Sequence, residues 1–261
     1  MSISFLGLSS SPLLWGPKRY VCIISTCGVC FFLTISIIGA NLLYNISASF
    51  VSVSPTEISK PFTLPIKLPA KFISIGAQNC HYSQNHGPFT GSINTDLIKS
   101  IGAKYVIIGH SENRVLGDTN NIINLKIKSA LKKKLKIIFC IGETLLQRKR
   151  KQTHKILKNQ ISKGLQGVKK LNKVLFAYEP VWSIGTGIVP KAKDLEKNVS
   201  FIRNNLLKKF RLKNPKILYG GSVNPKNVKN FKEINIINGF LVGAASQNPK
   251  KFIDIVKKTF N

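Results

Sequence analysis

Apolar and polar positions alternate regularly along this chain from about residue 72 to its end. Short, almost wholly apolar runs rich in β-branched residues are separated by longer charged segments with helical spacing. Runs without a polar face indicate strands covered on both sides, as in a parallel sheet. The pattern therefore predicts repeated strand–helix units in an α/β fold. The predicted strands are residues 72–75, 105–108, 137–140, 174–177, 217–219 and 239–242, and the predicted helices are residues 120–134, 153–169, 192–210 and 249–260.

The number of predicted strands bears on the kind of α/β fold. The chain has 261 residues, and about 250 are typical of a (β/α)8 barrel in one domain. Six predicted strands are two fewer than such a barrel needs, so two more must come from the first 65 residues. We predict an α/β protein with a (β/α)8 TIM barrel whose first βα unit is shortened or distorted.

The first 60 residues differ in character from the rest. Residues 20–44 are mostly apolar and uncharged, and they follow Lys18 and Arg19. That run is long enough to span a bilayer with its basic flank on the cytoplasmic side. No clean cleavage site follows it, which disfavours a signal peptide; the alternative is that it is partly a buried strand. We divide the chain into an atypical apolar extension, residues 1–34, and a barrel domain, residues 35–261.

The charge balance is strongly basic. Forty Lys and Arg face ten Asp and Glu, which gives a formal net charge of +30. A nucleic-acid reader would combine a basic stripe with interleaved aromatic residues or a known reader motif, and neither is found here. The lysines recur singly through helical stretches, which indicates a solvated basic surface. Such a surface attracts anionic substrates whatever its origin.

The number and positions of the cysteines indicate the redox compartment of the protein. An odd count, with three members inside the apolar run, does not suggest a disulfide framework. The pair Cys27 and Cys30 has no second ligand pair nearby, so a metal site is not predicted. We expect a reduced, cytoplasmic protein, with a membrane anchor through residues 20–44 as the alternative. The five cysteines are Cys22, Cys27, Cys30, Cys80 and Cys140.

Polar or glycine-rich signatures follow most of the predicted strands, at the end where a barrel carries its active site. The first signature is residues 109–114, GHSENR, directly after the strand at 105–108. A lone histidine is usually structural, but His110 stands at a strand end and precedes residues able to open a short helix. The N-terminus of that helix would hold the imidazole neutral and able to donate a hydrogen bond.

The second signature is residues 177–187, AYEPVWSIGTG. Glu179 stands at a strand end directly before Pro180, a suitable position for a general base. Residues 180–187 have a rigid start, a bulky apolar middle and a glycine-containing end. That composition suits a lid that closes over a ligand and excludes water; the alternative is a turn with a surface carboxylate.

Two glycine-rich turns follow the last two predicted strands. They are residues 219–223, YGGSV, and residues 241–246, LVGAAS. Small residues let backbone N–H groups approach an oxyanion closely, and the loops after the last two strands of a barrel commonly bind phosphate. The order and spacing of the four signatures predict a site for a small phosphorylated compound.

Together with AQNC at 77–80, FTG at 89–91 and CIGE at 140–143, these motifs resemble triosephosphate isomerase over about 190 residues. The resemblance implies interconversion of dihydroxyacetone phosphate and D-glyceraldehyde 3-phosphate through an enediolate, without cofactor or metal. It implies that Glu179 is the base that moves the carbon-bound proton and that His110 is the neutral group that polarises the carbonyl. That family is itself the standard example of this pairing.

The resemblance also implies supporting roles. Glu112 matches a supporting carboxylate, and Thr90 lies in the loop that the family inserts into a partner subunit, which implies a homodimer. The positions that match phosphate-binding residues, largely through backbone N–H groups, are Gly185, Ser222, Gly243 and Ala244.

The match weakens at the first strand. Its best candidate end is residues 37–45, IIGANLLYN, where Asn41 matches a substrate-binding asparagine but Leu43 replaces the family's substrate-binding lysine. Losing one preorganised donor typically costs about 3–4 kcal/mol of transition-state stabilisation. The alternative function is therefore an impaired or inactive homologue that binds phosphorylated ligands, either free or tethered to a membrane. The N-terminal region is either an anchor or altered at the gene level, and the sequence favours the second reading.

Overall fold

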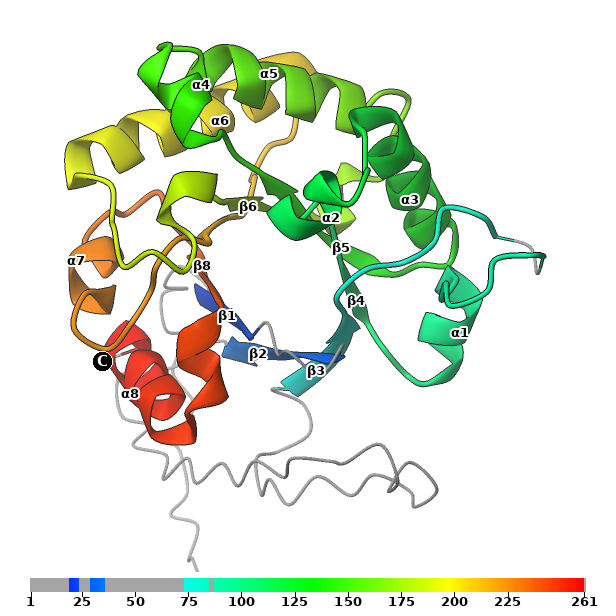
Figure 1. Cartoon of the computed structure of the whole chain (residues 1–261), viewed down its shortest axis with the longest axis horizontal. Helices are drawn as coiled ribbons and strands as arrows, with labels where there is room; N and C mark the ends of the chain where they lie inside the picture. The colour runs from blue at the N-terminus through cyan, green and yellow to red at the C-terminus, as the bar shows by residue number, and fades with distance from the viewer. Residues whose placement is uncertain (1–18, 24–28, 36–72, 85–86, 261) are drawn as a thin grey trace, which may run out of the picture.

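The computed structural model describes residues 19–23, 29–35, 73–84 and 87–260. Within these residues eight strands form a closed barrel in the order β1 to β8, with helices around its outside (Figure 1). The strands are β1 Arg19–Ile23, β2 Val29–Ile35, β3 Ile73–Ala77, β4 Tyr105–Ile108, β5 Lys136–Ile141, β6 Val174–Tyr178, β7 Ile217–Tyr219 and β8 Gly239–Val242. The α-helices are α1 Thr95–Ser100, α2 Ser111–Val115, α3 Asn120–Lys132, α4 Leu145–Lys149, α5 Thr153–Gly164, α6 Ala192–Phe210, α7 Val228–Lys232 and α8 Pro249–Phe260.

From β3 onward the chain repeats strand–helix units, and each strand pairs with the next in parallel. All six strands predicted after residue 72 are present, as are the four predicted helices. Helix α5 ends at Gly164, five residues before its predicted end, because the following turn places Gly167 at φ +69°, a left-handed conformation that a helix cannot continue. Helix α3 ends two residues early for a similar reason, since Lys134 has φ +63°.

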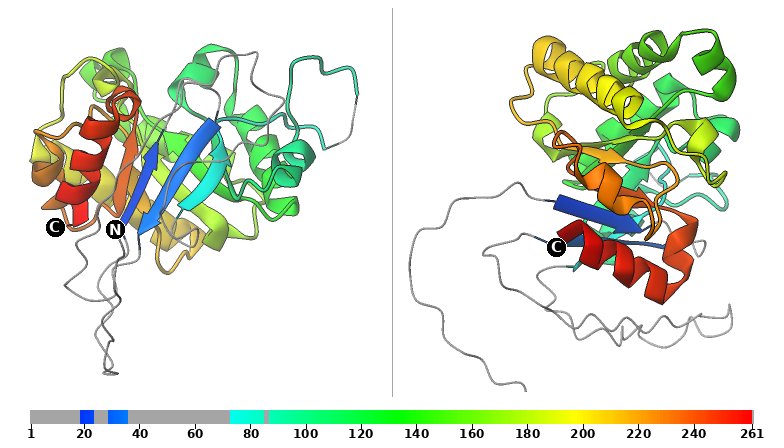
Figure 2. Two further views of the ribbon diagram at one scale, coloured as in Figure 1. Left: turned by 90° about the horizontal axis from the view of Figure 1, so that it is seen from below. Right: turned by 90° about the vertical axis from the view of Figure 1, so that its left-hand side faces the viewer.

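The two remaining strands come from the first 65 residues, as predicted, but they do not form a βα unit. Strand β1 pairs in parallel with β8, whereas β2 runs antiparallel to both β1 and β3 (Figure 2, left). Only residues 24–28 separate β1 from β2, and a parallel connection needs a dozen or more residues. The short connection therefore forces the antiparallel direction, which is the distortion of the first unit that the sequence predicted.

This arrangement changes the interpretation of the N-terminal region. Residues 37–45, which we expected to end the first strand, follow the second strand instead; Asn41 and Leu43 lie outside the described residues. Strands β1 and β2 occupy part of the run 20–44, so that run is not one continuous helix. Among the described residues no helix combines the length and apolarity needed to cross a bilayer. The division at residue 35 stays a prediction, although strands from both sides of it form the barrel wall.

The core has two layers because strand side chains alternate between the two sides of the barrel wall. Val106 and Ile108 of β4 belong to a cluster between the strands and the surrounding helices. Tyr105 and Ile107 belong to a smaller cluster inside the barrel. From β4 to β8 both faces of each strand are covered by apolar groups, so polar side chains gather where those strands end. The interior cluster is Tyr105, Ile107, Ile138, Cys140, Leu175, Ala177, Leu218 and Leu241.

Candidate active site

His110 lies at the mouth of the barrel, between the end of β4 and the start of α2. Gly109 makes the turn at φ +80°, and His110 then caps helix α2, accepting a hydrogen bond at Nδ1 from the backbone N–H of Glu112 over 3.4 Å. Because Nδ1 is an acceptor here, the proton of the neutral ring is on Nε2. The Glu112 carboxylate lies 3.8 Å from the same nitrogen, but its side chain is 80% exposed and is therefore well screened by solvent.

Glu179 follows β6 directly, and its backbone N–H donates to the carbonyl of Ile141 on β5 over 2.8 Å. Its side chain is almost fully buried, and Oε1 lies 3.4 Å from Nε2 of His110. Oε1 nevertheless accepts no hydrogen bond from the described residues. Burial raises the pKa of this carboxyl above its ordinary value, and the neighbouring His110 opposes that rise in part. The sequence-predicted base and electrophile therefore face each other.

Two glycines from the quoted motifs make room for Glu179. A side-chain carbon at Gly142 would overlap the Glu179 carbonyl, and one at Gly220 would lie 2.7 Å from Cγ and 3.2 Å from Oε1 of Glu179. Gly142 follows β5 and Gly220 follows β7, the two strands that flank β6, so the turns after both strands pack closely against Glu179. Glycine is needed at these positions because of close approach, not because of an unusual backbone angle.

A buried carboxylate, Glu143, ties the start of the predicted lid to β6. Its oxygens accept from Trp182 Nε1 over 3.0 Å and from the Tyr178 hydroxyl over 3.2 Å. Asn198 on α6 in turn donates to the Tyr178 hydroxyl over 2.8 Å. Burial raises the pKa of Glu143, although the hydrogen bonds from Trp182 and Tyr178 favour its charged form.

The predicted lid lies against the turn that follows β7. It begins with the 3-10 helix η4, Val181–Ser183, and continues through Gly185 and Gly187 at φ +68° and +74°. The Ser222 hydroxyl donates to the Ser183 carbonyl over 2.6 Å and accepts from the Gly187 N–H over 3.2 Å. The structure therefore brings the lid and Ser222, two of the predicted phosphate-binding elements, into direct contact.

Gly243 and Ala244 lie at the same end of the barrel, where β8 meets the 3-10 helix η5, Ala244–Gln247. Strands β7 and β8 are neighbours, so the turns that follow them lie side by side. The Gly243 carbonyl accepts from the backbone N–H and the hydroxyl of Ser246 over 2.8 and 2.7 Å, which fixes this turn. Thr90, in contrast, is exposed on the connection between β3 and α1, which projects from the barrel wall in Figure 1.

A cavity of about 490 Å³ adjoins His110 and Glu112 on the β3 side of the mouth. Lys126, a buried cation, also lines it, but its Nζ lies 2.7 Å from both carboxylate oxygens of Asp118 and 3.0 Å from Oδ1 of Asn79. The charge of Lys126 is therefore already neutralised by Asp118. Among the described residues no group of three or more His, Cys, Asp or Glu could hold a metal ion.

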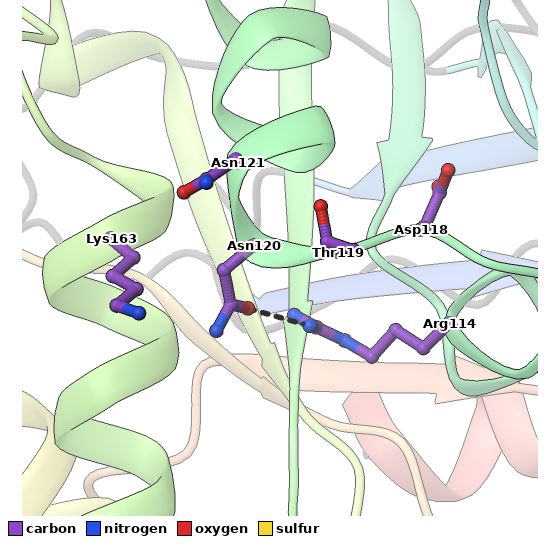
Figure 3. Close-up of a pocket in the computed structure, with 6 residues that line it drawn as sticks. All are labelled: Arg114, Asp118, Thr119, Asn120, Asn121 and Lys163. Atoms are coloured by element: carbon purple, nitrogen blue, oxygen red, sulfur yellow. Dashed lines mark hydrogen bonds between the residues drawn. The ribbon is translucent and has the colours of Figure 1, made fainter.

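A second hollow, of about 350 Å³, lies outside the barrel between the start of α3 and helix α5 (Figure 3). Arg114 lines this hollow, and its guanidinium donates to the carbonyls of Gly109 and Cys140 and to Asn120 Oδ1. This arginine thus braces the turn that presents His110. The lining residues are Arg114, Asp118, Thr119, Asn120, Asn121 and Lys163.

Known proteins resemble this chain over most of its length. A family model described as triosephosphate isomerase matches residues 46–259. The chain belongs to the triosephosphate isomerase family. The triosephosphate isomerase of Thermodesulfovibrio yellowstonii is 45% identical over 188 residues, covering 71% of this chain and 76% of the relative. That of Carboxydothermus hydrogenoformans is 41% identical over 223 residues, covering 82% and 87%.

A solved structure, the triosephosphate isomerase of Bartonella henselae, superposes with a TM-score of 0.66 at 33% identity, covering 71% of this chain and 77% of that one. Membership of the triosephosphate isomerase family confirms the predicted barrel fold and the predicted isomerase class. The family match begins at residue 46, so Asn41 and Leu43 precede it.

Sequence reasoning missed several polar residues of this triosephosphate isomerase family member. Glu143 and Tyr178 appear in the sequence only as parts of motifs, and Ser183 only as part of the lid. In the structure Tyr178 donates to Glu143, Glu143 accepts from Trp182 of the lid, and Ser183 donates to Ile188 at the far end of the lid. Asn198 carries no motif at all. The sequence signal for Glu143 was its place at the end of β5, the strand beside Glu179.

Proposed function

We propose that this chain interconverts dihydroxyacetone phosphate and D-glyceraldehyde 3-phosphate through an enediolate, with Glu179 and His110 as its catalytic residues. The observation that supports this best is the contact of 3.4 Å between His110 Nε2 and Glu179 Oε1. A carbonyl compound bound at that point would have a base at one carbon and a hydrogen-bond donor at the carbonyl oxygen.

The proposed reaction is a proton transfer in two halves. Glu179 takes a proton from the carbon beside the carbonyl, and the electron pair left behind forms the carbon–carbon double bond of the enediolate. The negative charge that develops on oxygen is stabilised by the Nε2–H of His110. A proton then passes from the neighbouring hydroxyl to this oxygen. Glu179 returns its proton to the former carbonyl carbon, while the other oxygen forms the carbonyl of the product. This reaction requires no cofactor and no metal.

The environment of the two side chains suits these roles. A base is most efficient when its pKa lies near the working pH, and burial raises the pKa of Glu179 in that direction. Because His110 Nδ1 accepts a hydrogen bond from the backbone, Nε2 is the nitrogen that can donate to a developing oxyanion. Glu112 supports the site by donating the backbone N–H that orients the ring.

We assign phosphate binding to backbone N–H groups of Gly185, Ser222, Gly243 and Ala244. Support comes from the adjacent turns after β7 and β8 and from the lid contact with Ser222. A net charge of +30 also draws a phosphate dianion toward the molecule. Asn41, outside the described residues, remains a predicted substrate contact.

A homodimer in the cytoplasm is part of the same proposal. Thr90 is exposed on a projecting loop, as a segment that enters a second copy would be. Val115 and Leu116, at the end of α2, are 85% and 84% exposed, which is unusual for apolar side chains in an isolated barrel. Sedimentation equilibrium tests this part: a fully active monomer would contradict it.

A coupled assay with D-glyceraldehyde 3-phosphate tests the activity. We expect turnover by the parent chain and loss of turnover in Glu179→Gln and His110→Gln. Glu196→Gln, the same change at an exposed site on α6, is the matched control and retains activity. A parent chain that binds a phosphorylated hydroxamate, a mimic of the enediolate, but turns over neither triose would be a non-catalytic binder, contrary to the proposal.

A further inference from the structure

The end of the barrel opposite the mouth carries a concentration of positive charge. Strands β4 to β7 are parallel neighbours, so the connections that lead into them lie together at that end. These connections are residues 101–104, 133–135, 165–173 and 211–216, and none of them contains Asp or Glu. We call the surface that they form with the start of β5 the basic end. Its cations are Lys104, Lys133, Lys134, Lys136, Lys169, Lys170, Lys173, Arg211, Lys213 and Lys216.

Several of these cations face solvent without a countercharge. Lys169, Lys170 and Lys213 are exposed, and no carboxylate of the described residues forms an ion pair with any of them. Lys133, in contrast, pairs with Asp96 of α1. Neighbouring like charges repel each other, so the unpaired lysines do not stabilise the barrel through electrostatic attraction.

The dipoles of the surrounding helices account for only part of this charge. A cation stabilises the last turn of a helix, but the effect falls off beyond that turn. Lys133 and Arg211 are the C-caps of α3 and α6 and fit this role. Lys169 and Lys170 lie well beyond the end of α5, and Lys213 lies beyond the C-cap of α6. The charge at these three positions is therefore not explained by the helices.

The carboxylates are distributed in the opposite sense. Glu112, Glu143 and Glu179 follow the ends of strands β4, β5 and β6, and Asp194 lies in the first turn of α6, all on the mouth side. Glu233, in the connection to β8, bounds the basic end on one side. Because the chemistry of a barrel takes place at the mouth, catalysis does not require the positive charge at the other end.

The shape of the basic end distinguishes between polyanionic partners. Proteins that bind single-stranded nucleic acids combine a basic groove with aromatic side chains on which bases stack. Among the described residues the exposed large aromatic side chain is Tyr82, which follows β3 on the mouth side. The cations are spread over an arc of four neighbouring strands, so a flat surface can approach all of them at once, whereas a duplex covers only a strip. Ile101, 70% exposed in the connection to β4, adds an apolar group that can enter a headgroup layer.

We propose that the basic end binds the surface of an anionic phospholipid bilayer, so that the barrel lies on the membrane with its mouth directed away from it. The negative potential of such a surface attracts lysines, and the attraction falls off within a Debye length. The residues of the active site take no part in this contact. The inference therefore goes beyond the proposed isomerase activity and does not depend on it.

Sedimentation of the full chain with lipid vesicles tests the contact. The vesicles consist of phosphatidylcholine, with or without phosphatidylglycerol. We expect binding to the mixed vesicles at about 0.15 M salt and its loss at about 1 M salt, where the Debye length is roughly 3 Å. We expect no binding to vesicles of phosphatidylcholine alone. A parent chain that does not bind the mixed vesicles, or that binds both kinds equally, would overturn the proposal.

Matched double variants locate the contact on the molecule. Lys169→Gln with Lys170→Gln should weaken binding to the mixed vesicles on the order of 20-fold, since each lysine near an anionic surface contributes a factor of about five. Lys193→Gln with Lys197→Gln removes the same charge from exposed positions near the start of α6, on the mouth side. This control should bind almost as well as the parent. Equal weakening in both variants would show that net charge alone attracts the vesicles, contrary to the proposal.

Acetylation of lysines, read by mass spectrometry, tests the orientation. Mixed vesicles should slow the modification of Lys169 and Lys213 and leave that of Lys193 unchanged. Equal protection of all three lysines would contradict an orientation with the mouth directed away from the bilayer. If the parent chain lacks isomerase activity, the proposed function fails, while vesicle binding and acetylation still test this inference.

A short DNA duplex, used in the same sedimentation buffer, tests the other class of polyanion. We expect the parent chain to bind the mixed vesicles in the presence of an equal concentration of duplex phosphate. A chain that binds the duplex through Lys169 and Lys170, but leaves the vesicles when the duplex is added, would have a nucleic acid as its partner. That result would overturn the assignment of the basic end to a membrane surface.

Discussion

Nε2 of His110 lies 3.4 Å from Oε1 of Glu179, although the two residues follow strands β4 and β6, which are separated by β5. The glycines after β5 and β7 allow this approach, since any side chain at Gly142 or Gly220 would collide with Glu179. Oε1 of the buried carboxylate has no hydrogen-bond donor among the described residues. One oxygen of the buried carboxylate is therefore left without a hydrogen-bond donor beside Nε2 of His110, an arrangement that suits catalysis more than stability.

Glu179→Gln is expected to lower kcat by about 10²- to 10⁴-fold, the usual range for removing a positioned general base. The same change should not lower stability, because it removes a buried charge with an unpaired oxygen. Activity is measured with the coupled assay and stability by thermal unfolding at pH 8. A melting temperature several degrees below that of the parent would show that the carboxylate stabilises the fold, contrary to this view.

The pH dependence of kcat/KM should report the raised pKa of Glu179. The reaction needs the carboxylate, so the rate falls as pH drops through the pKa of the base. Because burial raises that pKa, the acid limb should lie above the ordinary value of 4.5. Rates measured from pH 4 to 9 in buffers of constant ionic strength test this. An acid limb at or below 4.5 would mean that Glu179 is better solvated than its burial implies.

Gly220→Ala is expected to reduce kcat on the order of 100-fold while the barrel stays folded. The added methyl would lie 2.7 Å from Cγ of Glu179, so the carboxylate must shift, and displacements of about 1 Å can cost that much in rate. Gly243→Ala is a useful comparison because its methyl meets no atom of the described residues within 4 Å. It should disturb substrate binding more than turnover, which separate kcat and KM values will show.

The sequence predicted the strands from β3 onward, the four long helices and the pair His110 and Glu179. The strand and helix predictions succeeded because buried strands are apolar throughout. The structure brings His110 and Glu179 together at strand ends, and their catalytic roles stay predictions. Ser183 and Asn198 could not be predicted, since a hydroxyl or amide acquires its role only from partners distant in the chain. The antiparallel direction of β2 was also missed: the apolar run 20–44 shows no period that distinguishes two short strands from one long segment.

Glu143→Gln should change how stability depends on pH. Burial raises the pKa of Glu143, so between the ordinary value of 4.5 and the folded value the native state binds more protons than the unfolded state. Stability of the parent therefore falls as pH rises through that window. Glutamine cannot ionise, and its amide oxygen can still accept from Trp182. The stability of the variant should therefore not fall with pH in this window. Urea unfolding at several pH values should show that the free energy of unfolding of the variant rises relative to that of the parent as pH rises. A difference between the two that stays constant with pH would contradict the assignment.

Leu43→Lys tests whether residues 37–45, which lie outside the described residues, contact the substrate as the sequence predicted. If Leu43 replaces a substrate-binding lysine, the parent lacks a positive charge that the reaction would use. The buried Lys126 near His110 cannot supply it, because Asp118 already pairs with its ammonium. We therefore expect at least a tenfold gain in kcat/KM for Leu43→Lys, in line with the effect of one preorganised donor. Leu42→Lys adds the same charge one position away and serves as the matched control. Equal rates for the parent and both variants would show that residues 37–45 do not contact the substrate.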